Sequence, residues 1–356
     1  MSEQPHFERY EQERYEKSLL QLRELIKELP AFAARYFVAM ENTTTILTRL
    51  NYARDLKIFF RFLTEEIPAF SGRSVRDIQP ENLAEITVDD LYQFLDYLNM
   101  YAAADDTFIE NGERGKSRKV ACLRSFFKYY YKKGIIRENV CQLLETPKQH
   151  EKPIVRLEPD EVADLLDIVE KGEGLTAQQL RYHKKTVKRD LAILTLFLTT
   201  GIRVSELVGI NIEDVDFGNL SFAVTRKGGS RVVLYFDEET RQTLQDYLSE
   251  RKLRGTSTAG YPLFLSLQDK RMSVRSVENM VKKYAKLAAP LKRISPHKLR
   301  STFGTMLYGE TGDIYLVADV LGHKDVNTTR RHYAAQSDEN RRLASRAVKI
   351  RRREHS

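Results

Sequence analysis

The chain has 356 residues, of which 42% are hydrophobic, and its formal net charge is +8 at pH 7. At roughly 100–200 residues per domain, this length predicts two domains, each large enough for its own core. No stretch approaches the roughly 20 uninterrupted apolar residues of a membrane span, and the first residues lack the basic and apolar regions of a secretory signal. These features exclude a membrane protein and predict a cytoplasmic one, while the basic excess favours a polyanionic partner.

The N-terminal part of the sequence predicts helices. Residues 1–40 are rich in Glu, Arg and Lys with apolar residues at helical spacing, so we expect a helical N-terminal extension, interrupted near Pro30. Residues 41–147 are expected to form a small all-helical domain. One of its helices carries apolar residues at i, i+3, i+4 and i+7, namely Leu56, Phe59, Phe60 and Leu63. A capping box from Thr87 to Asp90 opens a later helix.

A helix predicted from Ser117 to Tyr131 carries basic residues on one face. They are spaced i, i+4 and i+8 and are Arg124, Lys128 and Lys132. We hypothesise that this basic ridge contacts DNA, with an ordinary solvated face as the alternative. The aromatic run inside the same helix is interpreted as core packing rather than base stacking, because nothing indicates a single-stranded substrate.

Residues 148–154 are expected to be a linker between two domains. The segment from Glu145 to Pro153 has two prolines, mixed charge and no apolar periodicity. The domain that follows is expected to span residues 155–340. A basic tail, residues 341–356, completes the chain, and its apolar positions at helical spacing predict a helix that docks on a neighbouring copy or on its own domain.

The second domain is expected to be mainly helical with a small β-hairpin. The segment Leu191–Leu198 is apolar on nearly every side, which predicts a buried helix that ends at Gly201. Residues 221–226 and 231–236 are rich in β-branched and aromatic side chains and flank a Gly-rich turn, the pattern of a hairpin. The fold class predicted for the whole chain is therefore mainly α, with a small β-sheet in the C-terminal domain.

The two cysteines, Cys122 and Cys141, lie in apolar helical surroundings and match no metal-ligand spacing. We interpret both as reduced packing residues. We expect no metal and no other cofactor.

Short segments of the second domain combine into one chemical pattern. They are Thr200-Gly-Ile-Arg203-Val-Ser-Glu-Leu207, the hairpin residue Lys227, His297-Lys-Leu-Arg300, Leu321-Gly-His323 and, ten residues later, Tyr333. Taken singly, each has an ordinary explanation, such as a salt-bridge arginine or a core tyrosine. Taken together, these residue types suit phosphodiester exchange, in which negative charge develops on the nonbridging oxygens and fixed guanidinium groups can neutralise it without a metal.

These motifs resemble the tyrosine recombinase family over nearly the whole chain. The likeness is closest to the Xer type, and to XerS-like recombinases that act without a paired second recombinase. The segments that carry it are Lys188–Ile193, Thr225–Gly229 and Ser276–Tyr284. The resemblance implies a two-domain DNA clamp, in which residues 41–147 are the core-binding domain and residues 155–340 the catalytic domain.

The resemblance also implies the roles of the site residues. Tyr333 would attack the phosphate and form a 3′-phosphotyrosyl link with a free 5′-hydroxyl, so the bond energy is kept and no ATP is required. His297 would take the tyrosine proton, and Lys227 would protonate the leaving 5′-oxygen. The remaining residues would act on the phosphate: Arg203 and Arg300 through guanidinium forks and His323 through a hydrogen bond.

The same resemblance implies the partners. They are double-stranded DNA with a specific recombination site and further copies of the chain, as a cyclic homotetramer on two DNA sites that resolves a Holliday junction. A DNA translocase is a candidate regulator. The expected role is chromosome dimer resolution; the alternatives are an integrase or excisionase of a mobile element and a non-catalytic DNA-binding protein with this fold. A non-catalytic protein would lack at least one site residue, and none is missing here.

Overall fold

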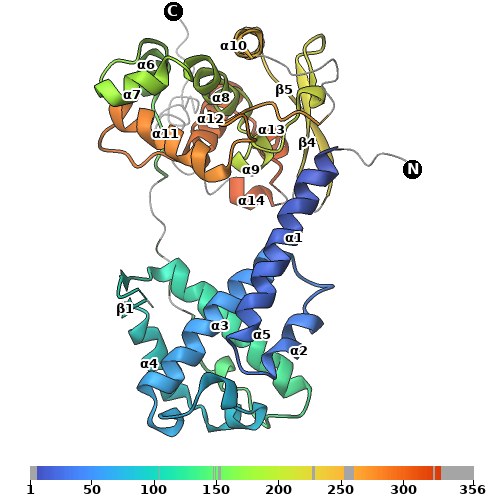
Figure 1. Cartoon of the computed structure of the whole chain (residues 1–356), viewed down its shortest axis with the longest axis vertical. Helices are drawn as coiled ribbons and strands as arrows, with labels where there is room; N and C mark the ends of the chain where they lie inside the picture. The colour runs from blue at the N-terminus through green and yellow to red at the C-terminus, as the bar shows by residue number, and fades with distance from the viewer. Residues whose placement is uncertain are drawn as a thin grey trace, which may run out of the picture. The chain divides into compact units, whose positions relative to one another are not determined.

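The structure is a computed structural model that describes residues 6–103, 105–146, 148, 150, 154–226, 229–251, 260–323 and 325–329 (Figure 1). The chain forms two compact units. The N-terminal unit comprises Tyr10–Lys152, and the C-terminal unit comprises Pro153–Ser356 together with Met1–Arg9. No helix in the described ranges is long and apolar enough to cross a membrane.

The first third of the chain is helical. Its α-helices are α1 (His6–Lys27), α2 (Ala33–Ala39), α3 (Ile46–Glu66), α4 (Val88–Tyr97) and α5 (Glu113–Lys132). Pro30 separates α1 from α2, as the sequence predicts, and the capping box at Thr87 and Asp90 is confirmed. Short 3₁₀ segments lie at Pro68–Phe70, Val75–Asp77, Pro80–Glu85 and Val140–Gln142. A ribbon of β1 (Tyr101–Ala102) and β2 (Phe108–Ile109) was not expected, because two-residue strands show no sequence period.

Aromatic side chains fill the core of the N-terminal unit, where α3 packs against α5 (Figure 1). The ring of Phe126 lies 5.8 Å from that of Phe60 and 4.9 Å from that of Tyr130, and all three side chains are buried. The Tyr130 hydroxyl donates to the Phe32 carbonyl at 2.9 Å, so its one polar group is satisfied. The interpretation of the aromatic run as packing is confirmed.

Both cysteines belong to the same core. Cys122 and Cys141 are unpaired and fully buried. Burial raises the pKa of both thiols, so neither is ionised at neutral pH. They are packing residues, as expected.

The C-terminal unit is a helical domain with one small sheet. Its α-helices are α6 (Pro159–Lys171), α7 (Ala177–His183), α8 (Val187–Thr200), α9 (Val204–Leu207), α10 (Glu238–Glu250), α11 (Val274–Ala288), α12 (Pro296–Thr311), α13 (Ile314–Leu321) and α14 (Val326–Thr329). The sheet is antiparallel in the order β3 (Val215–Asp216), β4 (Ser221–Thr225), β5 (Arg231–Tyr235). The predicted hairpin is thus confirmed as β4 and β5, with Thr225 opposite Arg231, whereas β3 was not predicted.

Helix α8 lies at the centre of this unit and contacts α6, α10 and α12 (Figure 1). Its apolar residues from Ala192 to Leu198 are buried, so the prediction of a helix enclosed on every side is confirmed. The helix ends at Gly201, whose φ of 59° lies in the left-handed region that favours glycine.

A buried carboxylate fixes α8 to α11. Asp190 is 1% exposed and accepts hydrogen bonds from the Tyr284 hydroxyl at 2.9 Å and the Thr186 hydroxyl at 3.0 Å. The guanidinium of Arg189 pairs with the same carboxylate at 2.6 Å. Burial and the negative charge of Asp190 together raise the pKa of Tyr284, which therefore stays a neutral donor.

The aromatic core generates a first prediction. Replacing Phe126 with Ala should lower the free energy of unfolding by about 3–5 kcal/mol, because a buried ring is lost and a cavity is left. Tyr131→Ala is the matched control: Tyr131 is on the same helix but 46% exposed, and its loss should cost no more than about 0.5 kcal/mol. Urea denaturation of the full chain, followed by circular dichroism, measures both; equal losses would contradict this description of the core.

Candidate active site

Arg203 is held at the start of α9 by a buried carboxylate. It is the N-cap residue of that helix, and its backbone N–H donates to Glu206 Oε2 at 3.1 Å. Its guanidinium Nη1 donates to Glu206 Oε1 at 2.7 Å. The Glu206 side chain is 5% exposed and that of Arg203 is 35% exposed. Glu206 therefore orients Arg203 from the interior, while the guanidinium keeps access to the surface.

Arg300 and His297 lie one turn apart on α12. His297, in the first turn, is exposed, whereas Arg300 is 5% exposed. The Arg300 guanidinium donates to the backbone carbonyls of Gly201 and Leu321. It therefore ties the end of α8, two residues before Arg203, to the end of α13.

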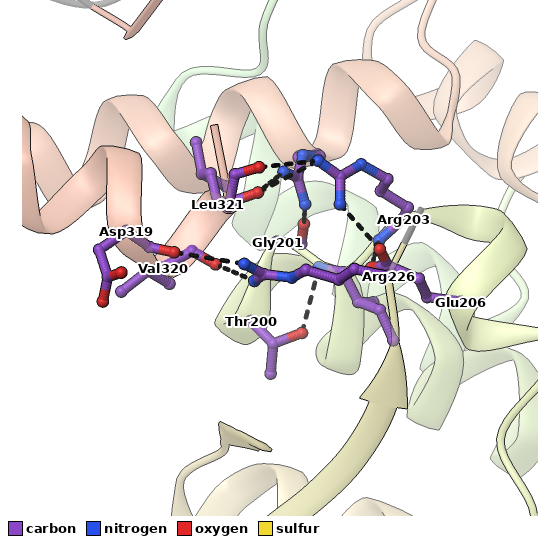
Figure 2. A network of polar contacts seen from close by, with 11 residues as sticks. Thr200, Gly201, Arg203, Glu206, Arg226, Asp319, Val320 and Leu321 are labelled. Carbon is purple, nitrogen blue, oxygen red and sulfur yellow. Dashed lines mark hydrogen bonds and ion pairs between the residues drawn. The ribbon is translucent and has the colours of Figure 1, made fainter. Parts of the chain in front are cut away.

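Arg203 reaches the C-terminal turn of α13 (Figure 2), where Arg300 also bonds. Arg203 Nη2 lies 3.4 Å from the Leu321 carbonyl oxygen and 3.3 Å from that of Gly322, and Arg300 donates to Leu321 as well. The last carbonyls of a helix have no partner within the helix and carry the negative end of its dipole, which favours cations. The helix end thus brings together guanidinium groups that would otherwise repel one another.

Arg226 was not among the predicted site residues, and it joins the same helix end. Its Nη2 donates to the Val320 carbonyl at 2.7 Å, and its Nη1 lies 3.5 Å from that of Asp319 (Figure 2). Burial lowers the pKa of its guanidinium; the Glu206 carboxylate opposes this effect and the charge of Arg203 reinforces it. Its position directly before Lys227 is a sequence signal, but its contact with α13 depends on the tertiary fold.

His323 follows the same helix end. Its backbone N–H donates to the Ala318 carbonyl at 2.9 Å, and its ring Nδ1 lies 2.7 Å from the hydroxyl of Thr329 on α14. Thr329 is fully buried. The hydroxyl therefore fixes the orientation of the imidazole, a role for Thr329 that the sequence does not reveal.

The structure brings Arg203, Arg300 and His323 together at one helix end and places His297 one turn from Arg300. Lys227 and Tyr333 lie outside the described residues, and so does the tail 341–356. No cluster of three or more His, Cys, Asp or Glu side chains suited to a metal ion occurs in the described part of the chain. Chemically, the arrangement is a concentration of guanidinium donors, suited to an anion such as a phosphate.

The predicted basic ridge on α5 divides into two kinds of residue. Arg124 is partly buried and donates to the Cys141 carbonyl at 3.3 Å, to the Thr146 hydroxyl at 2.8 Å and to the Leu144 carbonyl. Lys128 and Lys132 are exposed. All three remain predicted DNA contacts, but Arg124 also holds residues 141–146 against α5.

Known proteins resemble this chain over most of its length. Residues 155–340 match the model of the phage integrase family. Tyrosine recombinase XerC of Caldanaerobacter subterraneus subsp. tengcongensis is 35% identical over 289 residues, covering 78% of this chain and 75% of the relative. XerC of Syntrophus aciditrophicus is 31% identical, covering 87% of this chain and 93% of the relative. The chain belongs to the phage integrase family, the tyrosine recombinases. This confirms the predicted family and the prediction that the protein is an enzyme that breaks and rejoins DNA strands.

Further similarities concern the subtype and the fold of this recombinase. Tyrosine recombinase XerS of Streptococcus equi subsp. zooepidemicus is 28% identical, covering 87% of this chain and 93% of the relative. The solved structure of XerH bound to palindromic difH substrate has a TM-score of 0.64 at 20% identity, covering 85% of this chain and 80% of that chain. A lambda integrase fragment bound to a COC′ core site has a TM-score of 0.62 at 17% identity, covering 86% of this chain and 96% of that chain. The predicted fold class is confirmed.

The close packing at Gly201 generates the second prediction. Ala at this position would hold an unfavourable positive φ, and its Cβ would collide with the ring of Phe303 and with Leu321. Gly312→Ala is the matched control, because Gly312 caps α12 with a φ of 63° and has no atom within 4 Å of such a Cβ.

Gly312→Ala should cost about 1–2 kcal/mol of unfolding free energy for the backbone conformation alone. Gly201→Ala should cost about 1–3 kcal/mol more, because a packed ring must move. Urea denaturation measures both; equal costs would show that the close approach of Phe303 contributes nothing.

Proposed function

We propose that this recombinase resolves chromosome dimers in the cytoplasm by cutting and rejoining DNA through a 3′-phosphotyrosyl link to Tyr333. The observation that carries the proposal is the convergence of Arg203 and Arg300 on the Leu321 carbonyl, two residues before His323. A scissile phosphate beside this helix end would meet both guanidinium groups. A guanidinium has five N–H donors, so bonds to backbone carbonyls and to a phosphate can coexist.

The reaction is a transesterification. The Tyr333 oxygen forms a bond to phosphorus, the bond from phosphorus to the 5′-oxygen breaks, and a proton moves to that leaving oxygen. Because a phenol has a pKa of about 10, the attack needs a base, the role proposed for the exposed His297. Lys227 is proposed to donate the proton to the 5′-oxygen. Arg203 and Arg300 would stabilise the charge on the nonbridging oxygens, and His323 would donate a hydrogen bond to the same phosphate.

The assembly proposed for this activity is a homotetramer on two double-stranded sites. The supporting argument is symmetry: a head-to-tail contact, such as docking of the tail 341–356 on a neighbour, closes into a ring of four when it relates neighbours by a four-fold rotation. A DNA translocase is proposed as regulator. The relatives named XerC and XerS support the chromosomal role.

The third prediction tests the nucleophile. The wild-type chain should form a covalent complex with a nicked duplex that carries its recombination site, because the nick releases a short strand and traps the phosphotyrosyl link. Tyr333→Phe should form none, whereas Tyr315→Phe, which removes an exposed hydroxyl on α13, should behave as wild type. A denaturing gel detects the complex, with candidate sites taken from the host genome.

Other outcomes would reject the proposal in different ways. A complex formed by Tyr333→Phe would reject this nucleophile. Tight, salt-sensitive binding without any complex from the wild type would favour the non-catalytic alternative. If the DNA site that the protein cleaves lies at the ends of a mobile element, the result would favour the integrase role over chromosome dimer resolution.

The fourth prediction tests the ridge on α5. The double variant Lys128→Gln, Lys132→Gln should weaken binding to any duplex. The magnitude of the slope of log K, the association constant, against log[salt] should fall by about 1 for each phosphate that a lysine no longer neutralises. Arg124→Gln should instead lower the unfolding free energy by about 1–2 kcal/mol, because carbonyls of residues 141 and 144 lose a donor.

Lys171→Gln is the charge control, because Lys171 is exposed on α6 of the other unit. Fluorescence anisotropy at several salt concentrations measures binding. An unchanged slope for the double variant would favour the solvated-face alternative.

A further inference from the structure

Arg226 closes the turn between β4 and β5. Its backbone N–H donates to the Ser230 carbonyl at 2.8 Å, and its carbonyl accepts from the Gly229 N–H at 3.0 Å. Thr225, the last residue of β4, pairs with Arg231, the first residue of β5. Both the N–H and the carbonyl of Arg226 are therefore hydrogen-bonded within the hairpin, which fixes its backbone.

The side chain of Arg226 leaves the hairpin and reaches α13. Its guanidinium donates to the carbonyls of Asp319 and Val320 (Figure 2). Arg203 and Arg300 donate to the carbonyls that follow. The guanidinium also lies over Gly322, where a Cβ would collide with it. Gly322 thus has two reasons to be glycine: a φ of 61° and the close approach of Arg226.

Arg226 consequently joins two elements that carry different parts of the site. Lys227 follows it directly in the sequence, and His323 follows Gly322 at the end of α13. The sheet and α13 are separated by more than 90 residues in sequence at this contact, and the Arg226 side chain links them directly.

We propose that Arg226 is a positioning residue, which anchors the base of the β4–β5 turn to the C-terminal turn of α13 and thereby places Lys227 relative to the scissile phosphate. The inference rests on the proposed function of Lys227 as the proton donor. A lysine at position 226 could reach one carbonyl, but its single nitrogen cannot span two in the planar arrangement of a guanidinium.

The role predicts a chemical signature. Lys227 acts only on the leaving oxygen, whereas Arg203 and Arg300 act on the nonbridging oxygens. A substrate with sulfur in place of the 5′-bridging oxygen expels a thiolate, whose conjugate acid has a pKa of about 8.5 as in cysteine, so it needs no proton donor. Loss of proton donation should be rescued by this sulfur, and loss of charge stabilisation should not.

The fifth prediction compares single-turnover cleavage of nicked duplexes with oxygen or sulfur at the 5′-bridging position. On the oxygen substrate, Arg226→Met should slow cleavage on the order of 100-fold, as expected for a misplaced catalytic group. On the sulfur substrate, the cleavage rate of Arg226→Met should lie within about threefold of the wild-type rate, because the thiolate leaves without a proton donor. Lys227→Ala should show the same rescue, and Arg203→Lys should be slow on both substrates.

The ratio of the two rates within one variant does not depend on how much of the protein is folded, so partial unfolding does not obscure the result. Arg226→Lys, which keeps the charge, should show a smaller oxygen-specific defect. Equal slowing of Arg226→Met on both substrates, or none on either, would overturn the positioning role. Lys227→Ala without rescue would reject Lys227 as the proton donor and with it the positioning role, while a covalent complex from the wild type would leave the proposed cleavage by Tyr333 standing. No complex from wild type on either substrate would instead reject the proposed function itself.

Discussion

The C-terminal turn of α13 is the feature on which the site depends. Its carbonyls at Asp319, Val320, Leu321 and Gly322 accept hydrogen bonds from Arg203, Arg226 and Arg300. Guanidinium groups that share these carbonyls repel one another, and the partial negative charge of the helix end offsets that repulsion, together with the Glu206 carboxylate that pairs with Arg203. In the proposed reaction the cations would therefore be in place before a phosphate arrives, so little reorganisation would be needed when charge develops.

The rest of the C-terminal unit keeps that turn in position. The buried helix α8 ends at Gly201, and the Gly201 carbonyl accepts from Arg300, which in turn reaches Leu321. Two residues after Gly201, the buried Glu206 orients Arg203. Because each arginine bonds to more than one element, displacement of any of these elements moves a cation. We therefore expect lysine, with one nitrogen, to be a poor substitute at these positions.

The N-terminal unit uses a different physical principle. Its core is a cluster of interlocked aromatic rings between α3 and α5, and the buried Asp55 on α3 pairs with Arg118 and Lys119 on α5. The outer face of α5 is therefore available for charge, and Lys128 and Lys132 are exposed there. Arg124, on the same predicted ridge, bonds to backbone carbonyls of residues 141 and 144 instead of lying only on the surface. Helical spacing alone does not distinguish these two situations.

The sequence by itself determined the helices with strong apolar stripes, the capping box at Thr87, the end of α8 at Gly201 and the β4–β5 hairpin, because these depend on interactions between residues near in sequence. It also determined the family, since the order and spacing of the site motifs are sequence properties. Only the tertiary structure revealed Arg226 and Thr329 as parts of the site, and it also placed Arg124 against carbonyls. Arg226 and Arg124 bond to backbone carbonyls, and a carbonyl has no residue type for a sequence pattern to record. Thr329 meets the side chain of His323, six residues earlier, a spacing that no helical pattern records.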